Sequence, residues 1–398
     1  MLIRAVPVLR FRSDDCGFQR LFDSMSSLRE DRLAGIESLR GVAALMVIFF
    51  HLAELMKVPM PPALWFISTH FGLGVPLFYT LSGFVLAYGY ADQLGSGNRD
   101  VIKIFYLRRL FRIAPLFYMM LIAWLIVDWL VWKKTFSSQS LFLNITFLFG
   151  LVPGEHESIV WAGWSIGIEM LFYFLFPIFA AILANARSAV VGFIIACILS
   201  SAVNRAFMEQ GMGSFAYMNL LTHLPFFFAG VGSFRIWQAN GLKAHGVGWL
   251  LLAISLLAAA LLATEVVRTA LDGLRFGAAS RNAWAIAFGM LLLSACLVAN
   301  PVLEKGPLRF LGRLSFSLYL IHPMVLVALI KADFLLHLTS MGVGVTTTFF
   351  IAATFVVGLV TAISALAFQF VEEPGILLGR KLTARESALS PKIPLPEA

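Results

Sequence analysis

Residues 35–51 read GIESLRGVAALMVIFFH and begin the first long apolar run of the chain. Arg40 stands where the polar, basic N-terminal region meets that run, and His51 stands eleven positions further on. In a helix, eleven steps of about 100° amount to three turns plus about 20°, so the two side chains share one face. At about 1.5 Å per residue they lie roughly 16 Å apart along the axis. This spacing places Arg40 at a membrane surface and His51 near the middle of a ~30 Å hydrocarbon core.

The depth of His51 is the feature that indicates a function. A basic residue at a helix end, such as Arg40, often only extends to the lipid headgroups. A titratable side chain at mid-depth is costly to place in lipid, and such residues usually face a functional interior. We therefore expect the two residues to line a polar cavity, with purely structural roles as the alternative.

The composition predicts a polytopic membrane protein. The 398-residue chain is 60% hydrophobic and 13% charged, whereas soluble domains usually contain about 25% charged residues. The net charge of +8 arises from basic residues between the apolar runs, a pattern typical of cytoplasmic loops, and it does not indicate nucleic-acid binding. The three cysteines are far apart, so we expect neither a disulfide framework nor a metal site.

The apolar runs predict an all-α bundle of about ten transmembrane helices, each near the ~20 residues that a span requires. These runs cover about residues 38–57, 66–90, 113–132, 162–184, 188–207, 215–237, 246–264, 282–300, 312–334 and 345–370. A further apolar piece, 141–153, is short, and we expect it to be re-entrant or interfacial. The basic loops then lie on the side of the N-terminus, apart from Lys133 and Lys134, so the positive-inside rule makes both termini cytoplasmic.

The chain is expected to have three parts. Residues 1–34 are polar and rich in arginine, and they predict a partly disordered cytoplasmic tail. No apolar core with a cleavage site precedes residue 35, so we expect no signal peptide. Residues 35–375 form the transmembrane domain, and residues 376–398 form a short cytoplasmic tail.

Three arginines precede the third span in FYLRRLFRIAP, residues 105–115. Arg108 and Arg112 are four positions apart and share a helix face, and Arg109 flanks them. Such residues often only anchor a cytoplasmic loop. Guanidinium groups also bind phosphate in a bidentate manner, so a phosphate clamp at the mouth of the span is the functional alternative.

The fourth span also places polar side chains along one face. In WAGWSIGIEMLFYFLFP, residues 161–177, Ser165, Glu169 and Tyr173 are four positions apart and form a stripe on an apolar helix. Glu169 lies about 12 Å deep by helical rise, close to the depth of His51. A carboxylate at that depth requires a partner or a proton.

A similar stripe occurs in GRLSFSLYLIHPMVL, residues 312–326, where Ser315, Tyr319 and His322 share a face. Pro323 leaves the carbonyl of Tyr319 without its helical donor, and His322 or a water could use it. The structural alternative is a core histidine satisfied by a serine or tyrosine.

These segments together resemble the acyltransferase-3 family, integral-membrane enzymes that O-acylate bacterial polysaccharides and some small molecules. The resemblance covers about residues 35–375. Its elements, in order, are the Arg40 to His51 spacing, the aromatic-Tyr-x-x-Arg…Arg-Ile-x-Pro segment of residues 105–115, Trp-Ser-x-x-x-Glu from Trp164, Ser-x-Ser-x-Tyr-Leu-x-His ending at His322, and Glu-x-Pro from Glu372 to Pro374. Members often have a second glutamate after the first, whereas this chain has Met170.

The resemblance implies transfer of an acyl group, expected to be acetyl, from cytoplasmic acyl-coenzyme A to a hydroxyl of a glycan or another acceptor. His51 would act as a general base or carry the acyl group itself, and Arg40 would orient the donor. Glu169 would orient His51 or bind acceptor hydroxyls. The donor phosphates would be held by Arg108, Arg109 and Arg112. The residues expected to line or support the acceptor cavity are Ser165, Trp164, Tyr173, Ser315, Tyr319 and His322.

Further expectations concern the surroundings of this site. Glu372 and Pro374 would close the last helix at the inner face. No bound cofactor and no metal are required, and the expected partners are the lipid bilayer, acyl-coenzyme A and the acceptor. The expected location is a bacterial inner membrane.

The alternative function is a transporter or exporter of an acylated or anionic small molecule, because mid-membrane ionisable residues also occur along substrate pathways. We see no inverted repeat, which counts against this alternative. The sequence leaves open the acceptor, the acyl chain and the roles of His70, His156 and His223.

Overall fold

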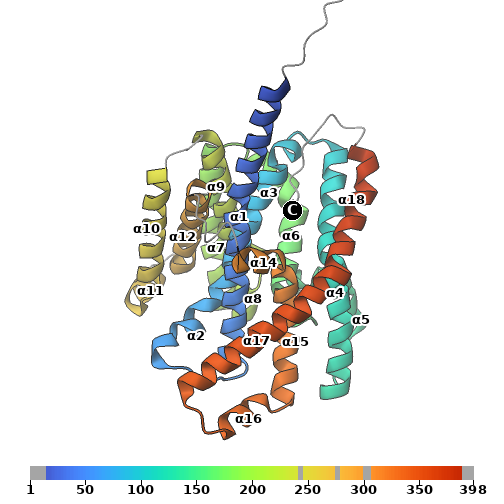
Figure 1. Ribbon diagram of the computed structural model, residues 1–398, viewed down its shortest axis with the longest axis vertical. Coiled ribbons are helices and arrows are strands. Elements are labelled where there is room, and N and C mark those ends of the chain that lie inside the picture. Colours follow the sequence, from blue (N-terminus) through green and yellow to red (C-terminus); the bar gives the residue numbers. More distant parts are fainter. Residues whose placement is uncertain (1–14, 241–244, 274–277, 299–305, 388–398) are drawn as a thin grey trace, which may run out of the picture.

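The computed structural model describes residues 15–240, 245–273, 278–298 and 306–387, and within these ranges the chain forms helices and no β-strand (Figure 1). The helices pack side by side into one bundle, as the apolar runs predict. The all-α fold class is therefore confirmed for the described ranges. Residues 1–14 and 388–398 of the two predicted tails lie outside them.

Seven helical runs in the described ranges are long and apolar enough to cross a membrane, or up to nine if each of two bent pairs is one span. The seven runs are Ala34–Glu54, Pro62–Leu94, Arg99–Trp132, Trp164–Ile182, Ala186–Glu209, Ala279–Leu297 and Val345–Ala384. The bent pairs are Gly246–Leu262 with Glu265–Asp272, at 82°, and Pro307–Arg313 with Ser315–Lys331, at 81°. The chain is therefore an integral membrane protein built as a polytopic helical bundle.

One predicted span, 215–237, is absent from those runs because it is too polar. It corresponds to α9 (Leu220–Asn240), whose mean hydropathy is lowered by His223, Arg235 and Gln238. α9 nevertheless contacts α3 (Gly74–Leu94), α7 (Ala186–Glu209) and α12 (Ala279–Leu297). Length and composition alone thus give fewer spans than the predicted ten, although a helix is present at each predicted position.

α1 (Asp15–Glu54) is a 40-residue helix that contains the first predicted span and extends beyond it. Residues 15–34 continue this helix, which differs from the expected partly disordered tail. No proline interrupts residues 15–54, and adding residues to a formed helix is favourable. Figure 1 shows the N-terminal end of α1 projecting beyond its neighbours.

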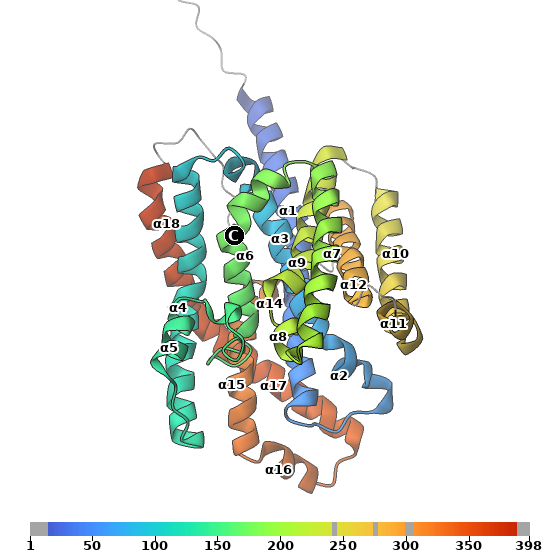
Figure 2. The same ribbon diagram turned by 180° about the vertical axis from the view of Figure 1, so that it is seen from behind.

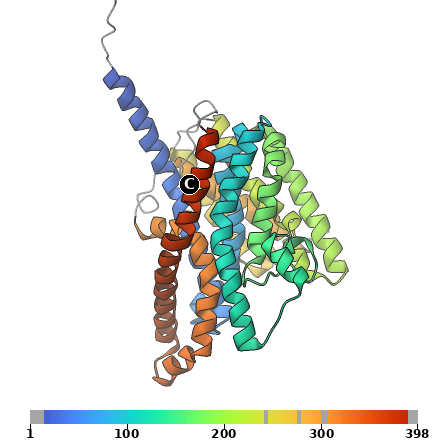
Figure 3. The ribbon, with the colours of Figure 1, turned by 90° about the vertical axis from the view of Figure 1, so that its right-hand side faces the viewer.

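The last predicted span, 345–370, is part of a longer helical run. α17 (Val345–Ala367), the π-helix η4 (Phe368–Glu372) and α18 (Glu373–Ser387) follow one another without a break. Figure 3 shows this run beside α4 (Arg99–Trp132). The tail predicted from residue 376 is therefore helical as far as Ser387, because α18 packs against α4 instead of leaving the bundle.

The short apolar segment 141–153 does not form a span. Its residues belong to α5 (Ser138–Ile145) and the 3-10 helix η3 (Phe149–Leu151), and both elements are too short to cross a membrane. The hydroxyl of Tyr118 in α4 donates a hydrogen bond to the carbonyl oxygen of Ile145, at 2.7 Å. Figure 2 shows α5 beside α4. The prediction that this segment does not cross is confirmed.

Two glycines allow a close contact between α3 and α9. A methyl group on Gly83 of α3 would overlap the carbonyl oxygen of Phe227 in α9, and one on Gly230 would overlap the carbonyl oxygen of Thr80. Helices in a membrane associate largely through close packing, which small residues permit. This contact positions α3, which contributes one wall of the cavity described below.

A second close contact joins α1 to α14 (Pro307–Arg313). A methyl group on Gly41 would overlap the carbonyl oxygen of Leu308, and one on Gly312 would overlap that of Glu37. The chain then turns by 81° from α14 into α15 (Ser315–Lys331). The start of α15 is thereby placed against α1 at Arg40, the residue before Gly41.

We expect Gly230→Ala to destabilise the protein, because the added methyl group forces α3 and α9 apart at a cost of about 1–3 kcal/mol. Gly232→Ala is the matched control, since nothing lies within 4 Å of a methyl group at that position of the same helix. Thermal melting of both variants in detergent tests this packing. Equal melting temperatures for the two variants would contradict it.

Candidate active site

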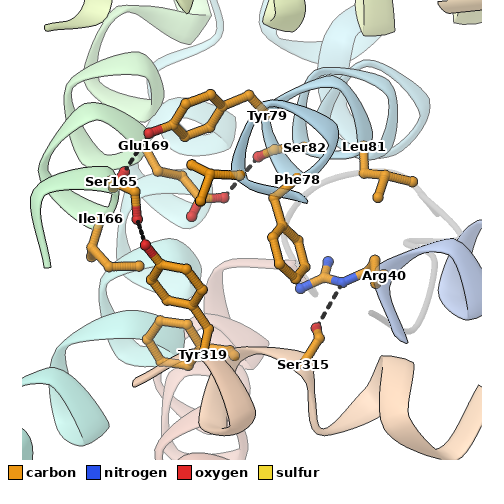
Figure 4. Close-up of a pocket in the computed structure, with 12 residues that line it drawn as sticks. Arg40, Phe78, Tyr79, Leu81, Ser82, Ser165, Ile166, Glu169, Ser315 and Tyr319 are labelled. Carbon is orange, nitrogen blue, oxygen red and sulfur yellow. Dashed lines mark hydrogen bonds between the residues drawn. The ribbon is translucent and has the colours of Figure 1, made fainter. Parts of the chain in front are cut away.

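A partly open cavity, with about 470 Å³ of space that includes some open solvent, lies between α1, α3, α6 (Trp164–Ile182) and α15 (Figure 4). Its lining residues are Arg40, Val75, Phe78, Tyr79, Leu81, Ser82, Ser165, Ile166, Glu169, Ser315, Phe316 and Tyr319. Five residues that the sequence predicted for the site, from three separate helices, therefore meet in one space. The helix periodicity placed them on common faces, and the bundle turns those faces toward one another.

Arg40 lies at the cavity with a partner on α15. Its Nε donates a hydrogen bond to Ser315 Oγ at 3.2 Å, and the side chain is half-buried (Figure 4). Arg40 therefore lies within the bundle and does not merely extend to lipid headgroups. Its position on the cavity wall agrees with the predicted helix face.

Glu169 accepts two hydrogen bonds on one oxygen. Ser82 Oγ donates to Oε1 at 2.8 Å, and the Tyr173 hydroxyl donates to the same atom. Ser82 belongs to α3, so these bonds also join α3 to α6. The other oxygen, Oε2, forms no hydrogen bond with any residue that the structure describes and remains available to a ligand.

The remaining polar groups on this side form a chain of hydroxyls. Ser165 Oγ donates to the Tyr319 hydroxyl at 2.6 Å, and that hydroxyl donates to the carbonyl oxygen of Ala162 at 2.8 Å. The Tyr79 hydroxyl donates to the carbonyl oxygen of Ser165 at 3.4 Å. The predicted polar stripes on α6 and α15 therefore contact each other and together form one wall of the cavity.

His51 lies one layer beyond this wall and is paired with His322. His51 Nδ1 is 3.1 Å from His322 Nε2, and the two ring centroids are 5.0 Å apart. The ring of His322 is also 5.9 Å from that of Tyr319, which lines the cavity. His322 is fully buried, whereas His51 is half-buried.

The hypothesis that Glu169 orients His51 is wrong in this structure. The partners of His51 are His322 and the carbonyl oxygen of Val47, at 3.0 Å from Nδ1. The hydrogen bonds of Glu169 go to Ser82 and Tyr173 instead. Helical rise predicted the same depth for the two residues, but Glu169 lines the cavity and His51 does not.

The three arginines of α4 have different partners. Arg109 is buried between the rings of Tyr90 and Tyr173, with its guanidinium carbon 5.3 Å and 5.9 Å from their centroids. Arg108 Nε instead donates a hydrogen bond to Thr383 Oγ1 of α18 at 3.0 Å. This hydrogen bond joins α4 to α18.

Arg112 lies between Arg40, Arg109 and Glu372, with which it interacts electrostatically. It forms no hydrogen bond with any residue in the described ranges. Arg40, Arg109 and Arg112, called the inner arginines below, thus concentrate positive charge, and of the three Arg40 lines the cavity.

Glu372 does not close the last helix, contrary to the sequence interpretation. It is buried in the π-helix η4, and Ser317 Oγ of α15 donates to its Oε2 at 2.6 Å. Pro374 is exposed at the second position of α18, where the absence of an amide proton does not interrupt the helix. The helical run therefore continues, and Glu372 joins α15 to η4 beside Arg112.

A group of aromatic rings lies where α6, α8 (Gly213–Tyr217) and α9 meet. The rings of Trp164, Tyr217 and His223 pack together, and His223 Nε2 donates to the carbonyl oxygen of Tyr217 at 2.7 Å. His223 is fully buried. His70 contacts the Thr69 hydroxyl at 2.7 Å and does not line the cavity.

The sequence analysis missed the contribution of α3 to the site. Phe78, Tyr79 and Ser82 line the cavity, and Ser82 is a direct partner of Glu169. The available signal was a tyrosine and a serine three positions apart inside an apolar span, which is a common pattern in membrane helices. Only the packing of α3 against α6 distinguishes Ser82 from other serines in spans.

The fold and cavity define an integral membrane protein with a polar interior, and the chain belongs to an acyltransferase family. The family described as an acyltransferase domain matches residues 33–368. Among curated proteins, ORF330 of Acidianus two-tailed virus, provisionally named an acetyltransferase, is 33% identical over 143 residues. The match covers 36% of this chain, and the chain spans 39% of the length of that relative. No solved structure matches the chain.

His156, which lies outside the spans, forms contacts that depend on pH. The amide of Gly154 donates to His156 Nδ1 at 3.1 Å, so Nε2 bears the proton and donates to Ser214 Oγ at 3.1 Å. Burial lowers the pKa of His156 below its ordinary value of 6.5, although Glu157 acts in the opposite direction. The folded protein therefore binds this proton less readily than the unfolded chain does.

We expect the Gly154 amide to lose protection from hydrogen exchange as the pH falls from about 7 to 5, because stability from the neutral imidazole is complete only above the unfolded pKa. Protection factors corrected for intrinsic exchange measure this change. His156→Gln should show weaker pH dependence, since glutamine does not titrate. Unchanged protection of Gly154 in the natural protein over this range would contradict the expectation.

Proposed function

We propose that this protein is an O-acyltransferase that uses acyl-coenzyme A, with acetyl as the expected acyl group. The supporting observation is a cavity lined by Arg40, one of the three inner arginines, with the His51 and His322 pair beyond its lining residue Tyr319. Positive charge suits a donor with several phosphates. Imidazole suits proton transfer or acyl transfer near neutral pH. Membership of the acyltransferase family supports the same reaction class.

The inner arginines are the proposed donor site. Arg112 has no hydrogen-bonding partner among the described residues, so its donors are available to a phosphate. Arg109 Nε likewise lacks a partner in the described structure. Arg108 is left outside this site because it is not among the groups that interact electrostatically with Arg112, and its Nε bonds to Thr383 of α18. The donor would enter from the cytoplasm, on the side to which the positive-inside rule assigns the basic loops.

The proposed transfer uses His51 at the reacting centre. His51 would take the proton of the acceptor hydroxyl while the hydroxyl oxygen attacks the thioester carbonyl of the donor. The carbon–sulfur bond would then break, and the proton on His51 would pass to the departing thiolate. In the alternative route, His51 first accepts the acyl group and then yields it to the hydroxyl.

Glu169 is proposed to bind the acceptor. Its Oε2 is available, whereas Ser82 and Tyr173 hold Oε1. An acceptor hydroxyl donating to Oε2 would be fixed on the cavity wall opposite Arg40. The acceptor class is a glycan or a hydroxylated small molecule, and the proposed location is a bacterial inner membrane with both termini in the cytoplasm.

We expect His51→Gln to reduce acyl transfer by at least ~10²-fold, because glutamine keeps hydrogen bonding but cannot act as base or nucleophile. The assay is acetyl-coenzyme A turnover by purified protein, together with the acetyl content of surface glycans in cells with and without the gene. Met46→Leu in the same helix is the control and should stay active. A transporter would show no turnover above solvent hydrolysis, and an active His51→Gln variant would remove His51 from the mechanism.

We expect Arg112→Ala to raise the KM for acetyl-coenzyme A by about tenfold or more, since a hydrogen bond between charged groups contributes roughly 1.5–3 kcal/mol. Arg108→Ala is the matched variant from the same helix face and should leave this KM nearly unchanged, because its partner is Thr383. Steady-state kinetics of both variants test the assignment. Equal increases in KM would return Arg108 to the donor site.

A further inference from the structure

The contact between His51 and His322 joins residues that are 271 positions apart in the chain. Each imidazole also contacts a backbone carbonyl oxygen one turn earlier in its own helix. His322 Nδ1 is 3.1 Å from the carbonyl oxygen of Leu318, and His51 Nδ1 is 3.0 Å from that of Val47. These four groups determine where the protons lie.

A carbonyl oxygen can only accept a hydrogen bond, so His322 Nδ1 must donate to Leu318. In the neutral imidazole of His322, Nε2 then has a lone pair, which faces His51. His51 Nδ1 thus meets two acceptors, Val47 and His322 Nε2, and must be the protonated nitrogen. It follows that Nε2 of neutral His51 has the free lone pair.

We infer that His322 is a positioning residue that holds His51 in the Nδ1-protonated form and makes His51 Nε2 the reacting nitrogen. This inference rests on the proposed function and deepens it. When Nε2 accepts the hydroxyl proton, the Nδ1–H keeps its acceptor on His322, which stabilises the imidazolium. The same proton leaves Nε2 for the departing thiolate, and His322 ends the cycle unchanged.

The geometry gives His322 a role that a carboxylate fills in other histidine-based enzymes, which is to fix the tautomer and orientation of the base. Glu169 does not fill it, because its bonds go to Ser82 and Tyr173. A neutral partner suits a buried site, since an added carboxylate would require its own compensation. His322 is itself held by Leu318 and is fully buried, so its orientation is constrained.

The first test reads the tautomer directly. Nitrogen NMR of the histidine-labelled protein should show His51 protonated at Nδ1 and unprotonated at Nε2, with the signal assigned by its loss in His51→Gln. The opposite tautomer would overturn the inference. This measurement needs no catalytic turnover, so it tests the tautomer even if the protein fails to transfer acyl groups and the proposed function is wrong.

The second test separates positioning from packing. His322→Leu should lower kcat by about 10–100-fold, a part of the ~10²–10⁴-fold that a general base contributes, with the KM for acetyl-coenzyme A unchanged. His322→Gln offers an amide oxygen to His51 Nδ1–H and should recover much of that loss. Leu326→Met, a volume-conserving change one turn away in α15, is the control and should stay active.

Either of two kinetic outcomes would overturn the positioning role. One is an equal loss of kcat in His322→Gln and His322→Leu, since the glutamine would then supply nothing that leucine lacks. The other is a rise in the KM for acetyl-coenzyme A without a change in kcat, which would place His322 in donor binding. If His322→Leu does not fold, His322→Gln remains the test, and a loss of kcat as large as that of His51→Gln would overturn the positioning role.

Discussion

Burying titratable side chains in an apolar bundle is the physical constraint on which the rest of this structure depends. Such groups are costly in a membrane unless each has a partner or faces a polar space. The structure meets this requirement across helices: Arg40 pairs with Ser315, Glu169 with Ser82, and His51 with His322. These pairs join α1, α3, α6 and α15, so the interactions that satisfy the polar groups also define the cavity.

Close backbone packing makes these pairs geometrically possible. The glycines Gly41 and Gly312 let α1 and α14 approach until a methyl group would overlap the opposite backbone. The 81° turn into α15 then places one polar stripe along α1, with Ser315 beside Arg40 and His322 beside His51. Gly230 likewise allows the backbones of α9 and α3 to approach closely. Small residues thus set the distances at which imidazole and guanidinium groups find partners.

The accuracy of the sequence predictions depended on whether the signal was local. Helix periodicity correctly placed Arg40, Glu169 and Tyr319 on interior faces, because spacing within one helix decides a face. It failed where a distant helix supplies the partner. Arg108 and Arg112 share a helix face, but the bond from Arg108 to Thr383 of α18 could not be predicted from that spacing. Glu372 resembled part of a helix end, yet a π-helix continues the run and turns its carboxylate toward Ser317.

The sequence by itself determined that this chain is an α-helical membrane protein, which helix faces are polar, and that its motifs follow the pattern of the acyltransferase family. Those properties follow from apolar run length and helical period, which are local. Only the tertiary structure decided that His51 pairs with His322 instead of Glu169, because proton positions depend on atoms brought together from segments hundreds of residues apart. Contact between helices, which no single-helix pattern encodes, is the physical reason for that division.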